Sequence, residues 1–154
     1  MRRFFVGLLL LGSLAATFAS DGISTGRVIK VLPLFLDLKG RDALSPSLFD
    51  RDAYQFQLRQ QTNEISAIRF DVLWKAANVE AANLKLRIEL RGVAAQGLPH
   101  QTTLERPVTH GYFSRWDALT LGGHEYKDFG ELIAWRTTLW AGDQLIGEQK
   151  SFLW

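Results

Sequence analysis

The sequence predicts an all-β fold, an antiparallel β-sandwich of about seven strands with one short helix after the first strand. Apolar and polar residues alternate through Ile65–Lys75 and again through Leu84–Arg91, which is the period of a strand with one buried face and one wet face. Turn residues separate such runs about every eight to twelve residues. The chain contains no cysteine, so the fold must be held by packing rather than by disulfides.

The first strand is expected at Arg27–Leu38, a segment rich in β-branched and other apolar residues. Pro33 lies inside this segment, and proline cannot donate a hydrogen bond to a neighbouring strand. We therefore expect an edge strand or a bulge at this position.

A helix is predicted over Pro46–Gln60. Ser45 followed by Pro46 is a helix start signal, because serine caps the free N–H groups and proline suits the first helical position. Phe49, Ala53 and Phe56 then recur at helical spacing. A strand through Tyr54–Leu58 is the alternative, since polar and apolar residues also alternate there.

Four further strands are expected after the two alternating segments: Gln101–Val108, Phe113–Leu121, Glu131–Trp140 and Gln144–Trp154. The last two form a predicted hairpin around Ala141-Gly142-Asp143. This strand pattern resembles that of immunoglobulin-like and fibronectin-III-like sandwiches. The resemblance covers strand spacing alone, because the Cys–Trp–Cys signature of antibody-type domains is absent.

The N-terminal residues have the three regions of a secretory signal peptide. Two arginines precede the apolar run Phe4–Leu11, and Thr17-Phe18-Ala19 places small side chains where signal peptidase requires them. We therefore expect residues 1–19 to be a signal cleaved after Ala19, residues 20–26 a flexible leader, and residues 27–154 a single β-sandwich domain. A retained membrane anchor is the alternative, but the apolar run is shorter than the roughly 20 residues that a spanning helix needs. The expected location is periplasmic or secreted.

The charge balance of the remaining chain argues against two classes of partner. The whole chain has 18 basic and 16 acidic side chains, and both extra basic residues, Arg2 and Arg3, lie in the predicted signal. A neutral mature domain gives no electrostatic support to a nucleic-acid partner or to attraction by anionic lipid.

The aromatic content favours a non-catalytic binding or accessory protein of the cell envelope, with a protein or a glycan as its partner. Exposed tryptophan and tyrosine rings suit stacking on a sugar or packing against a protein. The candidate binding residues are Trp140, Tyr126, Trp116 and Arg136. For Trp140, covering one end of the core is the alternative role.

Two other functions are weighed beside binding. One is a small secreted hydrolase using the acids between Asp117 and Glu131, with Glu125 and Asp128 among them, because paired carboxylates can perform acid–base chemistry. The other is a small outer-membrane β-barrel, because the chain ends on an aromatic residue, Trp154. Lys150 and Glu148 would then face lipid, which disfavours it.

No catalytic residue, cofactor or metal ligand is predicted. His100, His110 and His124 are expected in loops and are ten and fourteen residues apart. Zinc sites place pairs of ligands much closer in sequence. No G-x-S-x-G motif or phosphate-binding loop is present.

Overall fold

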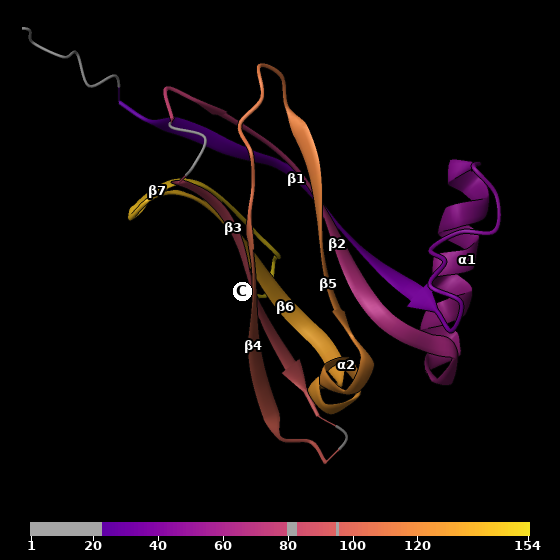
Figure 1. Ribbon diagram of the computed structural model, residues 1–154. Helices are drawn as coiled ribbons and strands as arrows, with labels where there is room; N and C mark the ends of the chain where they lie inside the picture. The colour runs from indigo at the N-terminus through magenta and orange to yellow at the C-terminus, as the bar shows by residue number, and fades with distance from the viewer. Residues whose placement is uncertain (1–22, 80–82, 95) are drawn as a thin grey trace, which may run out of the picture.

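The computed structural model describes residues 23–79, 83–94 and 96–154. The predicted signal at residues 1–19, its cleavage at Ala19 and the first residues of the leader lie outside this range. The described residues form two antiparallel sheets (Figure 1) with strand orders β1-β2-β5 and β4-β3-β6-β7. Their strands are β1 (Thr25–Asp37), β2 (Ile65–Ala77), β3 (Leu84–Val93), β4 (Pro99–Pro107), β5 (Arg115–Gly122), β6 (Glu131–Ala141) and β7 (Gln144–Lys150). The all-β, two-sheet prediction is confirmed.

The prediction of one helix over Pro46–Gln60 was wrong in two respects. Helix α1 spans Leu48–Gln60, because Ser47 rather than Ser45 is the cap and accepts a hydrogen bond from the N–H of Asp50. A second helix, α2 (Gly123–Phe129), lies in a segment for which no helix was predicted. It has no side-chain cap and begins at a glycine, so the usual start signals are missing from its sequence. A short 3₁₀ turn, η1 (Thr62–Glu64), leads from α1 into β2.

The core lies between the two sheets and follows the alternation seen in the sequence. Phe70, Val72 and Trp74 of β2 face Leu86 and Ile88 of β3, and all five are buried. Each such side chain contributes about 2 kcal/mol when it is removed from water. The two sheets form the two layers that enclose this core. At one edge β1 approaches β7 so closely that a side chain at Gly147 would meet the backbone of Arg27.

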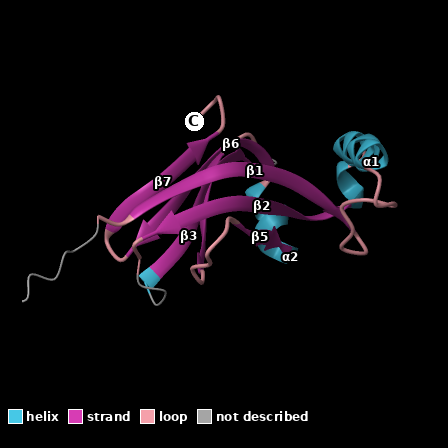
Figure 2. Ribbon diagram, turned by 90° about the horizontal axis from the view of Figure 1, so that it is seen from above, coloured by secondary structure: helices cyan, strands magenta, loops and turns pink. Residues whose placement is uncertain are grey.

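Helix α1 lies beyond the ends of β1 and β2, apart from the main layers (Figures 1 and 2). Its inner side carries Leu58 and Tyr54, which pack beside Ile65. The stripe that signalled the helix faces solvent instead, with Phe49 81% and Phe56 63% exposed. Among the described residues, no helix is long and apolar enough to cross a membrane.

Candidate functional site

The four candidate binding residues occupy three separate places. Trp140 and Arg136 lie on β6, on the outer face of the four-stranded sheet. Trp116 lies on β5, on the outer face of the other sheet, and Tyr126 lies on α2 against the core. The structure therefore brings together only Trp140 and Arg136.

The outer face of the four-stranded sheet carries charges that neutralise one another. We call it the ion-paired face, and it consists of Lys85, Arg87, Glu89, Glu105, Arg136, Trp140 and Glu148. Arg136 lies 2.9 Å from Glu148 and 3.6 Å from Glu89. Lys85 and Arg87 both bind Glu105, and the Arg87 hydrogen bond lowers the pKa of that carboxyl group despite some burial. Most cations of this face are thus paired with acids, whereas Lys150, which lies opposite Arg136, forms no ion pair among the described residues.

The two aromatic candidates with polar tips are also engaged within the fold. The indole N–H of Trp140 donates to Thr138 at 2.9 Å, and the guanidinium of Arg87 lies 5.6 Å from its ring centre. Tyr126 is half-buried between the two groups of core residues, and burial raises the pKa of its hydroxyl. Trp140 is therefore engaged on the outer face of its sheet, and Tyr126 packs against the core.

The four acids considered for hydrolysis lie on three elements. Asp117 is on β5, where its carboxylate accepts the indole N–H of Trp74 at 2.9 Å. Glu125 and Asp128 are on α2, and Glu131 begins β6. Since Asp117 lies five residues before the end of its strand, roughly 16 Å separates it from the start of α2. Asp117 and the other three acids are therefore distant in the fold.

The three histidines lie apart, and two of them lie outside loops. His100 is in β4 and His124 is in α2, which corrects the expectation for both. His110 is in the loop before β5 and bonds the carbonyl oxygen of Ala76 at 3.0 Å. Among the described residues, no cluster of three or more His, Cys, Asp or Glu side chains is placed to hold a metal ion.

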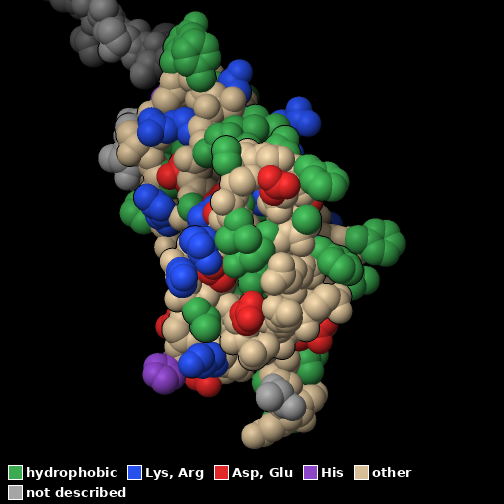
Figure 3. Space-filling view, turned by 90° about the vertical axis from the view of Figure 1, so that its right-hand side faces the viewer, with side chains coloured by type: hydrophobic (Ala, Val, Ile, Leu, Met, Phe, Trp, Pro, Cys, Tyr) green, Lys and Arg blue, Asp and Glu red, His purple; other side chains and the backbone are tan. Residues whose placement is uncertain are grey.

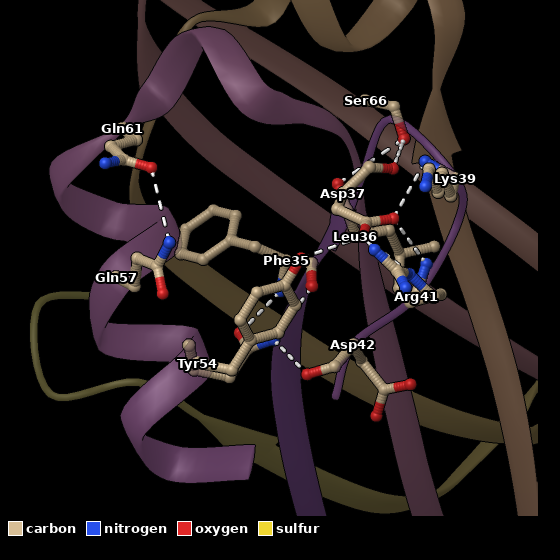
Figure 4. Close-up of polar contacts among 11 residues, drawn as sticks. Phe35, Leu36, Asp37, Lys39, Arg41, Asp42, Tyr54, Gln57, Gln61 and Ser66 are labelled. Carbon is tan, nitrogen blue, oxygen red and sulfur yellow. Dashed lines mark hydrogen bonds and ion pairs between the residues drawn. The ribbon is translucent and has the colours of Figure 1, made fainter. Parts of the chain in front are cut away.

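A buried carboxylate, Asp37, stands at the junction of β1 and α1 (Figure 4). It accepts hydrogen bonds from the N–H groups of Lys39 and Arg41, from the Arg41 guanidinium, and from the Tyr54 hydroxyl at 2.8 Å. Burial by itself would raise the pKa of Asp37, but these donors outweigh it and hold the pKa well below its usual range. With its oxygens already occupied, Asp37 fixes the helix in place rather than acting as a base.

Exposed aromatic side chains gather at the opposite end of β2, where the chain passes from β4 to β5. Tyr112 is 88% exposed, Phe113 76% and Trp116 52%. The rings of Tyr112 and Phe113 meet edge to face with their centres 4.9 Å apart. The base of this loop is fixed by buried Val108, whose N–H binds the carbonyl oxygen of Leu84, and by His110. The aromatic rings consequently project from a held loop.

Basic side chains lie at the same end of the three-stranded sheet. Arg27 of β1 and Lys75 of β2 are exposed cross-strand partners, and Arg115 opens β5. Lys30, Leu73 and Trp116 form the adjacent row across the three strands of this sheet. We call this region the aromatic end; its members are Arg27, Lys30, Lys75, Tyr112, Phe113, Arg115 and Trp116. Among the described residues, no carboxylate forms an ion pair with any of its four basic side chains.

A shallow, open depression of about 180 Å³ lies at this end. It is lined by Thr25, Gly26, Arg27, Lys75, Ala76 and Ala77, so two cations border it. Sequence reasoning selected Trp116 but not its neighbours. The run His110–Trp116 contains three aromatic residues and an arginine within seven positions, and this density was the available signal. The pairing of Arg27 with Lys75 depends on strand register, which the sequence pattern alone did not give.

Comparison of the chain with protein-family models, with curated proteins and with solved structures found no match.

Proposed function

We propose that this chain is an exported, non-catalytic binding domain of the cell envelope that contacts its partner through the aromatic end. The exposure of Tyr112, Phe113 and Trp116 carries the proposal. Large aromatic rings held in water on a fixed loop contribute nothing to the core, and such residues dominate binding energy at interfaces. A protein or a glycan is the partner class expected from the sequence.

The export signal and the sandwich type belong to the same proposal. Residues 1–19 have the regions of a cleavable signal, which would deliver the domain to the periplasm or the exterior. The strand order β1-β2-β5 facing β4-β3-β6-β7 supports an arrangement of the immunoglobulin-like or fibronectin-III-like kind, folds that commonly serve recognition on cell surfaces.

Affinity capture from envelope extract, with a glycan array in parallel, tests the proposal. The test variant carries Tyr112→Ser, Phe113→Ser and Trp116→Ser. The matched control carries Phe49→Ser and Phe56→Ser, which removes exposed aromatic side chains from α1 instead. We expect the captured component to be lost with the test variant and kept with the control. Equal capture by the wild-type protein and the test variant would refute the proposal.

A further inference from the structure

We propose that the aromatic end docks on the surface of an anionic membrane, with Arg27 and Lys75 contacting lipid phosphates and the rings of Tyr112, Phe113 and Trp116 entering the headgroup region. This inference rests on the proposed function and gives the same surface an anionic lipid partner in place of the protein or glycan expected from the sequence. Its grounds are the charge arrangement, the aromatic side chains and the point at which the chain enters the fold.

The strongest ground is the juxtaposition of Arg27 and Lys75. Side chains directly opposite each other in an antiparallel pair share one face of the sheet, so two positive charges face each other here. Like charges in this position destabilise a sheet. Among the described residues, no carboxylate is paired with either side chain. Two opposed cations beside an open depression are arranged to share an anion.

The aromatic side chains specify what kind of surface carries that anion. Trp116 shares the outer face of its sheet with Lys30 and Leu73, and Leu73 lies between the indole ring and the cation. Tyr112 and Phe113 project beyond it from the loop. Tryptophan and tyrosine concentrate at the headgroup level of membranes, where one part of the ring is dry and the other wet. Basic residues beside them are attracted by anionic lipid.

The chain enters the fold at this same end. Ile23, the first residue described, precedes β1 directly, and Figure 1 shows the start of β1 and the loop before β5 at the same end of the molecule. The apolar run Phe4–Leu11, which is predicted to enter the membrane during export, is twelve residues before Ile23. Twelve residues span at most roughly 40 Å. The aromatic end is therefore the end of the domain that follows the predicted signal along the chain.

Charge is distributed unevenly over the domain, so a total charge of zero does not prevent attraction to anionic lipid at one end. The chain without its signal is neutral in total, but the acids of α1 and α2, among them Asp50, Asp52, Glu125 and Asp128, lie at the far ends of the strands. Figure 3 shows Lys and Arg side chains at the upper end of this view and also along its left side toward the lower end. A neutral domain with one basic end is attracted to an anionic surface in one orientation.

Vesicle flotation tests the inference. The protein recovered from cells expressing the full chain is mixed with vesicles of phosphatidylcholine alone or with phosphatidylglycerol, and all variants are compared in the recovered form. We expect binding to the anionic vesicles only, weakening as salt is added. The variant Arg27→Gln/Lys75→Gln should bind roughly 30-fold more weakly, about fivefold for each charge.

Matched variants distinguish the effect of cations at the aromatic end from the effect of the total charge of the protein. Lys39→Gln/Lys127→Gln removes two exposed cations at the other end and should bind as the wild type does. Tyr112→Ser/Phe113→Ser should weaken binding at every salt concentration, because burial of rings is not screened. Equal binding to both kinds of vesicle, no binding, or an equal loss in the Lys39/Lys127 variant would overturn the inference. If envelope capture succeeds without vesicle binding, the proposed function survives and the membrane partner is refuted.

Discussion

The ion-paired face and the aromatic end are built from the same residue types, but they use them differently. On the ion-paired face, Lys85, Arg87 and Arg136 each contact a carboxylate, and Trp140 donates its N–H to Thr138. At the aromatic end, Arg27 and Lys75 face each other and Trp116 is half exposed. The first arrangement satisfies the protein internally, whereas the second leaves charge and apolar surface for a partner.

This difference shows why residue type alone is a weak guide to a binding surface. Trp140 with Arg136 and Trp116 with Arg115 are equivalent as sequence features. What separates them is whether neighbouring strands supply acids: Glu89 and Glu148 both contact Arg136 of the first pair. A basic side chain is available to bind a ligand when no carboxylate of the fold pairs with it. Adding or removing such carboxylates tests this idea.

The largest effect is expected at Asp37, where the paired charge is buried rather than exposed. Asp37→Asn leaves the Tyr54 hydroxyl and the Arg41 guanidinium without a charged acceptor. We expect the free energy of unfolding to fall by about 2 kcal/mol near neutral pH. Urea unfolding monitored by circular dichroism would measure this, and an unchanged midpoint would show that the cluster does not hold α1.

The same variant has a signature in pH. Because the folded-state pKa of Asp37 is depressed, its contribution is present above the unfolded pKa of about 3.9 and is lost as the pH falls towards the folded value. The stability gap between wild type and Asp37→Asn should therefore be full at pH 6 and above, and narrow below about pH 4. A gap that stays constant on acidification would contradict the assignment.

A smaller effect is expected on the ion-paired face. Glu105→Gln removes the shared partner of Lys85 and Arg87. These groups are partly exposed, so we expect a loss of about 1 kcal/mol in unfolding free energy, and less at high salt. The change also leaves two more cations unpaired on the sheet. Vesicle binding by Glu105→Gln could increase by as much as it falls in Arg27→Gln/Lys75→Gln. Unpaired cations on any surface would then be enough for binding, and the contrast between the two surfaces would be refuted.

The smallest effect has the opposite sign. Lys75→Glu turns the like-charged pair with Arg27 into a cross-strand ion pair, so we expect the unfolding free energy to rise by about 0.5 kcal/mol. Binding to anionic vesicles should fall at the same time. Gain of stability with loss of binding would identify Lys75 as a residue kept for function, whereas a loss of stability would show that Lys75 already supports the fold.

The strands were predictable because their patterning is local. Leu84–Arg91 and Ile65–Lys75 alternate strictly, and the structure buries the apolar set of each. Helix α2 was missed because its segment begins at Gly123 and ends before Gly130, both of which have positive φ, so glycine marked the boundaries of a helix as well as turns. The aromatic end could not be predicted in the same way. Its pairing of Arg27 with Lys75 depends on the register of β1 against β2, which is set by tertiary structure and not by local sequence.

Gln55 has a consequence that reaches beyond one molecule. Its side-chain amide accepts from the N–H of Phe35 and donates to the carbonyl oxygen of the same residue, both at 2.8 Å, as an adjoining strand would. Because β1 is the outer strand of its sheet, these are groups that another chain could pair with. While α1 is docked, Gln55 occupies the hydrogen-bonding groups of Phe35, so a second strand cannot pair with β1 at this position.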